Sequence, residues 1–412
     1  MRVLQAKINR KQDIRELMRR IRVDAYGVKI MLPKALACLV QLDSITNIKA
    51  NILKQEMLSL GGDAAIARTA LSGGVKTTDC LLMGNLAQFG RLSEKLKVQP
   101  FGLDGMGREL SLALANYQKE SFRLDLGRYK INLTAGKAAI MGILNLTPDS
   151  FSGDGLYSSF VVRRPSSVDA DKTVNSIVDY ALQLVDDGAD IIDIGGESSR
   201  PGAKAVSIRE ELKRVIPALK RIARSVKAPI SIDTYKPAVA EAALSAGAVM
   251  VNDITGLRDL KLARAVAAHK AAVVIMHMRG NPRTMQVNPR YSSVVDEVID
   301  YLSLAIKRAL DAGIDREKIV IDPGLGFGKT LRHNLEILKR LDEFKVLGRP
   351  IMIGASRKSF IGKILDADVS GRLCGTVSAS VAGVSRGAKL VRVHDVSAAH
   401  QALRVLSAIN SA

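Results

Sequence analysis

In the C-terminal two thirds of the chain, short apolar runs end repeatedly in side chains that can bind or ionise. Eight such runs follow one another from about residue 138 onward, and a sheet built for packing alone would not end all eight in this way. The polar residues at these ends are Asn145, Glu197, Ser198, Ser199, Arg200, Asp233, Thr234, Asn252, Asp253, His277, Asp322, Ser356, Arg357, Lys358, Arg392, His394 and Asp395. Their joint placement favours an enzyme.

The residue types divide into two chemical groups. Asp233, Asn252 and Asp322 suit the hydrogen-bonding edge of a flat heterocycle, because buried carboxylates need donors as partners. The second group suits anionic oxygens such as those of a phosphate, and consists of Arg200, Lys358, Arg392 and His394. Together they predict a site for a polar heterocycle that carries a phosphate. For any one residue alone, an ordinary ion pair or a strand-end turn explains the sequence equally well.

The elements that must position these residues alternate between strands and helices. The apolar runs are continuous, as in strands buried on both faces of a parallel sheet. They occupy residues 138–147, 189–196, 229–234, 249–256, 272–278, 319–328, 350–357 and 388–396. Stretches with helical periodicity separate them, as at residues 209–226 and 292–313. Eight such units fit an α/β fold of the TIM-barrel type better than an open doubly wound sheet, and a barrel gathers its strand ends at one face.

Two loops that contain glycine follow predicted strands. The glycine-rich residues 323–330 approach a phosphate-binding P-loop but lack its first glycine, because Pro323 stands there. Their glycines instead predict a close approach of the backbone to a flat ligand. Residues 145–155 are rich in Ser, Asp and Gly, and we expect them to form a loop over the site.

The first third of the chain differs from the rest in pattern and in charge. Residues 1–134 predict a smaller, mostly helical domain with room for one or two strands, followed by the barrel domain at residues 135–412. Through residue 137 the chain has 23 Lys and Arg against 12 Asp and Glu, a net charge of +11 out of +20 for the whole chain. The sequence assigns this domain no chemistry, and structural, interface and regulatory roles stay open.

Composition excludes several classes of protein. The apolar fraction of 47% is that of a globular protein, and no apolar run is long enough for a membrane span. Three distant cysteines argue against a disulfide framework or a zinc site. With no apolar segment typical of a secretory signal, a cytoplasmic location is expected. Aromatic residues are only 4% and no nucleic-acid-binding motif is present, so anionic substrates explain the charge better than nucleic acid does.

Several longer motifs resemble the dihydropteroate synthase family. They are MGILNLTPDSFSGDG at 141–155, ADIIDIGGESSRPGA at 189–203, SIDT at 231–234, VNDITG at 251–256, MHMRGNPRTMQ at 276–286, IDPGLGFGKT at 321–330, IGASRKSFIG at 353–362 and VRVHDV at 391–396. The resemblance extends from residue 138 to the C-terminus. It implies condensation of (7,8-dihydropterin-6-yl)methyl diphosphate with 4-aminobenzoate, giving 7,8-dihydropteroate and diphosphate. In the family the C–O bond breaks to a pterin-stabilised cation, which the amine attacks.

The resemblance also implies roles for individual residues. It assigns the pterin to Asp233, Asn252, Met276, Asp322, Gly354 and Lys358. It assigns the diphosphate to Asn252, Arg392 and His394, and 4-aminobenzoate to Ser199, Arg200, Phe327 and Ser356, where sulfonamides would compete. The residues expected to act in catalysis are Lys358, Asp322 and Arg200. Asn145 would bind a Mg²⁺ cofactor, and a homodimer through the barrel is expected, without a nucleic-acid or membrane partner.

Two points qualify the resemblance. The first loop reads SFSGDG where the family usually has SFSDGG, which moves a carboxylate to Asp154, and no role is assigned to that residue. Ser199 stands where the family usually has Thr.

A corrinoid-type, pterin-dependent methyltransferase of the same superfamily is the alternative function. It needs no diphosphate site, so the SRKS and RVHDV segments argue against it.

Overall fold

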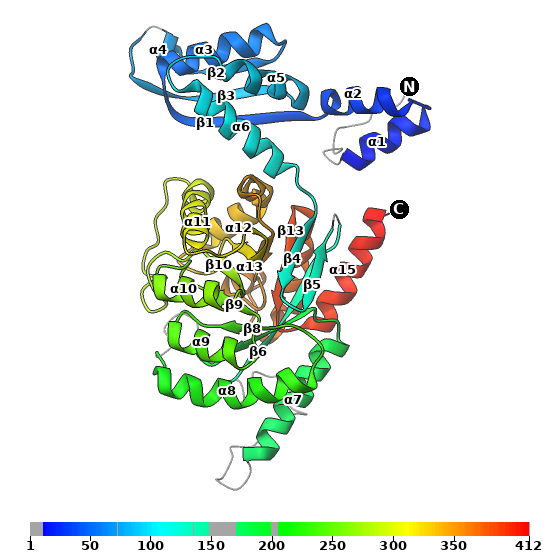
Figure 1. The fold of residues 1–412 in the computed structure, drawn as a ribbon, viewed down its shortest axis with the longest axis vertical. Helices are drawn as coiled ribbons and strands as arrows, with labels where there is room; N and C mark the ends of the chain where they lie inside the picture. Colours follow the sequence, from blue (N-terminus) through cyan, green and yellow to red (C-terminus); the bar gives the residue numbers. More distant parts are fainter. Residues whose placement is uncertain (1–10, 72, 135, 148–169, 199–204, 412) are drawn as a thin grey trace. The chain divides into compact units, whose positions relative to one another are not determined.

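A computed structural model describes residues 11–71, 73–134, 136–147, 170–198 and 205–411. The chain divides into two compact units, Met1–Ala115 and Asn116–Ala412, drawn in Figure 1. No described helix is both long enough and apolar enough to cross a membrane.

The first unit packs helices on one face of a small antiparallel sheet with the strand order β1-β3-β2. Its elements are α1 (Lys11–Arg20), α2 (Ala25–Ala35), β1 (Ala37–Thr46), α3 (Asn47–Ser59), β2 (Asp63–Ile66), α4 (Arg68–Leu71), β3 (Thr77–Asn85), α5 (Leu86–Leu96) and α6 (Leu103–Tyr117). Leu53, Phe89 and Leu103 are fully buried in its core. The unit is mostly helical, as predicted. Its sheet has three strands. With β4 (Phe122–Leu126) and β5 (Tyr129–Leu133), the described part of residues 1–134 contains five strands where one or two were expected, and short strands such as the four-residue β2 leave no visible period in the sequence.

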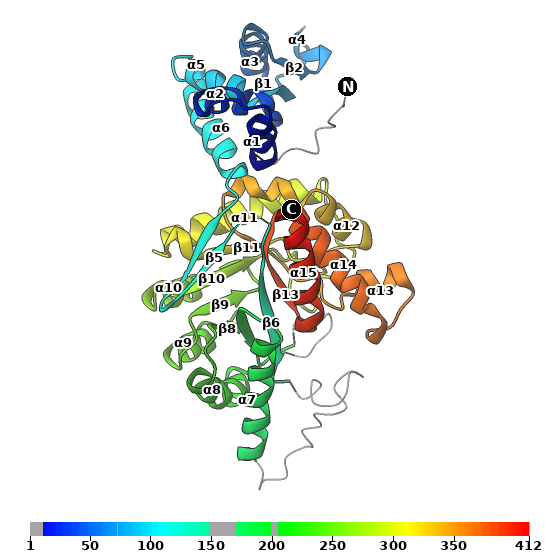
Figure 2. The same ribbon diagram turned by 90° about the vertical axis from the view of Figure 1, so that its right-hand side faces the viewer.

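The second unit is a closed barrel of eight parallel strands in chain order, and helices cover its outside. The strands are β6 (Ala139–Asn145), β7 (Ile191–Gly195), β8 (Ile230–Asp233), β9 (Met250–Asp253), β10 (Ala272–Met276), β11 (Ile319–Asp322), β12 (Ile351–Ile353) and β13 (Ala388–Val393). Strand β13 pairs with β6 and closes the barrel (Figure 2). The predicted TIM barrel and all eight of its strands are thereby confirmed.

The helices of the barrel unit follow the strands one by one, with an additional helix after β12. They are α7 (Ala170–Asp186), α8 (Ile208–Ser225), α9 (Pro237–Ser245), α10 (Leu260–Ala268), α11 (Val294–Asp311), α12 (Leu331–Lys339), α13 (Ser359–Leu365), α14 (Leu373–Ser385) and α15 (Val396–Ser411). Their apolar sides pack on the strands. Val215, Leu219 and Ile222 of α8, for example, are buried in the large core between sheet and helices.

A hairpin of β4 (Phe122–Leu126) and β5 (Tyr129–Leu133) closes the amino-terminal end of the barrel. Leu124, Leu126 and Leu133 pack there against barrel-interior side chains such as Met141 and Met250. The sequence placed the domain boundary after residue 134, which put this hairpin in the first domain. The compact units instead divide after Ala115, because the apolar face of the hairpin is buried by the barrel.

Candidate functional site

A cavity of about 420 Å³ opens at the carboxyl ends of the barrel strands. Eleven of the thirteen residues to which the sequence assigned a role line it, and these are Asn145, Asp233, Asn252, Met276, Asp322, Phe327, Gly354, Ser356, Lys358, Arg392 and His394. The other two, Ser199 and Arg200, lie outside the described residues, as does Asp154.

Strand register explains why residues far apart in the sequence meet here. Asn145 is paired with Gly195, Gly195 with Asp233, and Asp233 with Asn252 across four neighbouring strands. These positions therefore lie at one level of the barrel. Polar side chains that follow separate apolar runs converge on one face because parallel strands end together.

A buried ion-pair cluster forms the floor of the cavity. Arg392 donates from Nε to Asp193 Oδ2 and from Nη2 to Asp233 Oδ2, both at 2.7 Å. Asn252 Nδ2 donates to the same Asp193 oxygen at 2.9 Å. Burial raises the pKa of Asp233 to about 7, and Arg392 opposes that rise. Burial alone would lower the pKa of Arg392, but Asp193 and Asp233 outweigh burial and raise that pKa above its usual value, so the guanidinium stays charged.

Lys358 extends along the opposite wall. Its ammonium group donates to the carbonyl oxygen of Leu325 and lies 4.1 Å from the centre of the Phe327 ring. Burial lowers the pKa of Lys358 to about 8, although the neighbouring Asp322 favours the charged form. Burial also raises the pKa of Asp322, whose Oδ1 accepts a hydrogen bond from Gly324 N at 2.7 Å. The cavity thus has a lysine that can lose its charge near neutral pH.

The loop after β12 is held against the end of β13. Ser356 Oγ lies 3.0 Å from His394 Nδ1, and the backbone N–H of His394 donates to the same hydroxyl at 3.2 Å. Arg357 forms a two-pronged ion pair with Asp395, at 2.7 and 3.1 Å. Because both partners of that pair are largely buried, it fixes the loop that carries Ser356 and Lys358.

Apolar side chains form the remaining wall. A small cluster of buried residues lies beside the polar floor, and it contains Ile254, Met276, Met278, Met285 and Phe327, with Tyr235 packed against it. Methionine side chains adapt to flat ligands. A planar ring could therefore lie against this wall while its polar edge faces Asp233 and Asn252.

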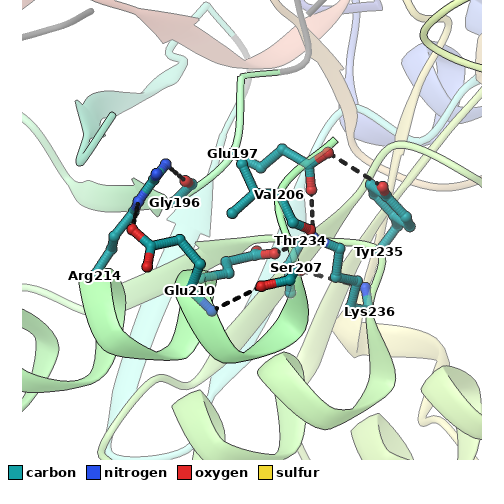
Figure 3. A network of polar contacts seen from close by, with 10 residues as sticks. Gly196, Glu197, Val206, Ser207, Glu210, Arg214, Thr234, Tyr235 and Lys236 are labelled. Atoms are coloured by element: carbon teal, nitrogen blue, oxygen red, sulfur yellow. Dashed lines mark hydrogen bonds and ion pairs between the residues drawn. The ribbon is translucent and has the colours of Figure 1, made fainter. Parts of the chain in front are cut away.

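A second buried network joins the end of β7 to the end of β8, as Figure 3 shows. Lys236 Nζ donates to Glu197 Oε2 and Glu211 Oε2, both at 2.5 Å, and to the carbonyl oxygen of Val206 at 2.6 Å. Tyr235 Oη donates to the other Glu197 oxygen at 3.3 Å. Glu197 lines the cavity, so Lys236 ties a cavity wall to the base of α8.

Asn145 has the chemistry and the room of a single-residue cation ligand. A Cβ atom at position 195 would lie 3.2 Å from Asn145 Oδ1, so glycine at that position keeps the amide oxygen accessible. Among the described residues no three His, Cys, Asp or Glu side chains form a metal-binding group. An ion here would take most of its ligands from substrate and water, as Mg²⁺ commonly does.

Some residues of the site were missed by the sequence interpretation. Asp193 lies inside β7 rather than at its end, yet it holds both Arg392 and Asn252. A carboxylate within an otherwise apolar strand is a signal that could have found it. Met285 and Arg372 also line the cavity, but they come from segments beyond the strand ends, where no such signal exists.

The arrangement can hold a heterocycle and an anion together. Carboxylate and amide groups of β8, β9 and β11 face one side of the cavity, and Lys358, Arg392 and His394 bring positive or hydrogen-bonding groups. Preorganised cations of this kind stabilise a leaving group that departs with negative charge.

Comparison with known proteins identifies the relatives of this chain. The model of the pterin binding enzyme family matches residues 141–394. Dihydropteroate synthase of Escherichia coli strain K12 is 44% identical over 273 residues, which are 66% of this chain and 92% of that protein. A structure of Xanthomonas albilineans dihydropteroate synthase with 4-aminobenzoic acid is 41% identical with a TM-score of 0.63, and covers 71% of this chain and 99% of that one.

One relative also matches the first unit. A probable bifunctional folylpolyglutamate synthase/dihydropteroate synthase of Halobacterium salinarum is 38% identical over 402 residues, 96% of this chain and 46% of that protein. That match includes nearly all of the first unit as well as the barrel. The family match spans the whole cavity and the synthase match most of a complete relative, so the chain belongs to the dihydropteroate synthase family of pterin binding enzymes.

Proposed function

We propose that the protein condenses (7,8-dihydropterin-6-yl)methyl diphosphate with 4-aminobenzoate in this cavity. We propose also that the cavity residues have the binding and catalytic roles predicted from the sequence. The observation that carries this proposal is that acceptors for a pterin edge and cations for a diphosphate line one cavity of about 420 Å³. A methyltransferase would need the first set alone.

The pterin would lie on the floor of the cavity. Asp233, Asn252 and Asp322 would accept or donate along its polar edge, while Met276 and Gly354 would contact its faces. Lys358 would complete this half. A methyl group at position 354 would meet only Arg392 Cβ, at an ordinary contact distance of 3.8 Å, and would otherwise take up open space that the glycine leaves free.

The reaction requires the C–O bond to break before or as the new C–N bond forms. The diphosphate leaves with the bonding electron pair, and the electron-rich pterin stabilises the cationic methylene carbon. The amine nitrogen of 4-aminobenzoate then attacks that carbon and loses a proton. Asn252, Arg392 and His394 would bind the diphosphate, and their positive or donor groups would lower the barrier to its departure.

A Mg²⁺ ion would fit this scheme at Asn145. One amide oxygen at the cavity wall, kept open by Gly195, suits an ion that is otherwise held by phosphate oxygens and water. When bound, the ion would neutralise part of the diphosphate charge. Substituting Asn145→Ala should raise the Mg²⁺ concentration needed for half-maximal rate.

The second substrate would bind beside Phe327 and Ser356, with Ser199 and Arg200 completing the pocket. The ring of Phe327 offers an aromatic face, and Lys358 lies over it. The Xanthomonas albilineans relative was solved with 4-aminobenzoic acid, which supports this compound as the second substrate. Sulfonamides should compete for the same pocket.

We also propose a homodimer through the barrel and a cytoplasmic location. A groove between α14 and α15 is lined by Leu373, Val377 and Val405, and Val405 is 61% exposed. An apolar face of this kind suits a second copy of the chain. Introducing Val405→Glu should shift the sedimentation of the full chain toward the monomer.

The cytoplasmic location rests on the cysteines. All three are free thiols, in keeping with a reducing compartment.

The activity is tested with the full chain, both substrates and Mg²⁺. Dihydropteroate and diphosphate should appear in equal amounts, and neither should form when one substrate is omitted. Formation of neither product with both substrates present would overturn the proposed function.

A further inference from the structure

A second lysine lies behind the cavity and belongs to none of the roles above. Lys329 ends the glycine-rich loop after β11 and is only 3% exposed. Its Nζ donates to the carbonyl oxygen of Phe327 at 3.1 Å and lies 2.8 Å from His277 Nδ1. It forms no ion pair with any described residue. A buried lysine that has no carboxylate in direct contact within the described part of the chain is costly to a protein, so its retention calls for a reason.

The contacts of Lys329 suit an uncharged amine. Burial lowers its pKa well below the usual value, and nearby Lys358 adds to that effect while Asp322 opposes it. His277 is 5% exposed, and burial first, then Lys329, lowers its pKa to about 2, so its ring is neutral. A neutral amine has two N–H groups, and Phe327 O and His277 Nδ1 are two acceptors. The Tyr301 ring packs nearly perpendicular to the His277 ring, with 4.8 Å between the ring centres.

The loop that Lys329 contacts needs external support. Gly324, Gly326 and Gly328 all have positive φ, between +64° and +79°. Side chains supply several of the loop's hydrogen bonds, such as that of Gln286 to Gly326 O and that of Gly326 N to Asn334 Oδ1. Lys358 holds the loop from the cavity side at Leu325 O. Lys329, which is itself buried, holds the loop at the carbonyl oxygen of Phe327, two residues after Leu325. Lys329 therefore holds the backbone carbonyl of Phe327, while Lys358 lies 4.1 Å from the centre of the Phe327 ring.

We propose that Lys329 is a positioning residue, which sets the Phe327 ring in the 4-aminobenzoate pocket through its two hydrogen bonds and is kept at a cost in folding stability. The inference rests on the proposed function, because that function makes Phe327 a wall for the second substrate. It makes Lys329 distinct from Lys358, which faces the substrates themselves. A lysine kept for stability alone would show the opposite balance between stability and activity.

The test compares Lys329→Met with Lys339→Met, which removes an exposed lysine from α12. Lys329→Met should unfold at the same or a higher temperature than wild type, because methionine fills the space without a buried amine. Its KM for 4-aminobenzoate should rise about tenfold, while its affinity for the pterin diphosphate changes less than about threefold. Lys339→Met should match wild type in both respects.

A third variant examines the hydrogen bonds directly. Lys329→Gln keeps an NH₂ group with two donors and should retain more 4-aminobenzoate affinity than Lys329→Met. A Lys329→Met chain that has a lower melting temperature than wild type, or does not fold, would contradict the claim that Lys329 costs folding stability. An unchanged KM for 4-aminobenzoate would contradict the positioning role. Equal losses in Lys329→Gln and Lys329→Met would contradict the role of the two donors. Because wild type must be active for any of these comparisons, failure of the proposed function is seen separately, as an inactive wild type.

Discussion

The two units of this chain differ in their ion pairs: within the described residues, pairs in which both side chains are largely buried occur in the barrel unit and not in the first. In the barrel, Arg392 pairs with Asp193 and Asp233 in buried surroundings, and Lys236 pairs with a Glu211 side chain that is 1% exposed. In the first unit the ion pairs lie nearer the surface, as for Lys95 with Glu56 at 43% and 18% exposure. Both units have continuous apolar cores. The difference therefore lies in where each places its charges.

Buried charges are expensive to keep, so a unit that retains several of them has another use for them. In the barrel, Asp233, Asp322, Lys358 and Arg392 line one cavity. The first unit shows no comparable gathering among its described residues, and its stability rests on apolar packing and on capped helices such as α5, where Asn85 and Gln88 form a reciprocal cap. The comparison indicates that the catalytic chemistry belongs to the barrel unit, hairpin included.

The largest expected effect comes from moving the point at which the chain is cut. A chain that begins at Asn116 should keep a folded barrel and its synthase activity, since β4 and β5 remain. A chain that begins at residue 136 should either remain unfolded or form aggregates, because Met141, Met250 and Leu390 lose the cover of Leu124 and Leu126. Circular dichroism and the synthase assay on both chains decide this. Equal behaviour would move the functional boundary back to residue 134.

The next largest effect is expected at Lys358. Its ammonium group lies over Phe327 and beside Asp322 at the point where the two substrates would meet. Substituting Lys358→Ala should lower kcat/KM by about a thousandfold, as loss of a preorganised charge does in other active sites. Its melting temperature should change little, since burial of the charged amine is unfavourable. Near-normal turnover would remove Lys358 from the catalytic machinery.

A third prediction sets one ion pair of each unit against the other. Replacing Lys236 by Met leaves Glu211 buried without its partner, and should lower the free energy of unfolding by about 3–5 kcal/mol. The matched change Lys95→Met removes an exposed lysine from Glu56 and should cost less than about 1 kcal/mol. Urea denaturation of each variant measures both. Similar costs in the two units would break the distinction drawn above.

The parts of the site that sequence could predict share one physical signal. Asp233, Asn252 and Asp322 stand at the ends of continuous apolar runs. Parallel strands of one sheet must bring such positions together. Asp193 lies inside its run and gave no such signal, and Arg372 reaches the cavity from a segment that follows no strand. The boundary predicted after residue 134 separates the hairpin from the barrel that buries it, because a short alternating pattern such as that around Leu124 shows which face is apolar and not what covers it.

The smallest expected effect is the dependence of kcat/KM on pH, which should arise from ionisable residues of the barrel cavity. Burial lowers the pKa of Lys358 to about 8, so kcat/KM should fall about tenfold per pH unit above that value as the cation is lost. Burial raises the pKa of Asp233 to about 7, so activity should also fall as pH drops below 7. The maximum should therefore be narrow, between about pH 7 and 8.

The sign of the stability change separates this titration from unfolding. Because the folded pKa of Lys358 is below its unfolded value, the unfolded chain binds more protons between the two, and this group makes the folded state more stable as pH rises from 8. Activity should thus fall above pH 8 without any contribution of this lysine to a lower melting temperature. In Lys358→Arg, which stays charged, the alkaline fall should disappear even if the rate is reduced. Persistence of the same fall in that variant would assign it to another group of the cavity, and would place the charge that matters for diphosphate departure elsewhere than on Lys358.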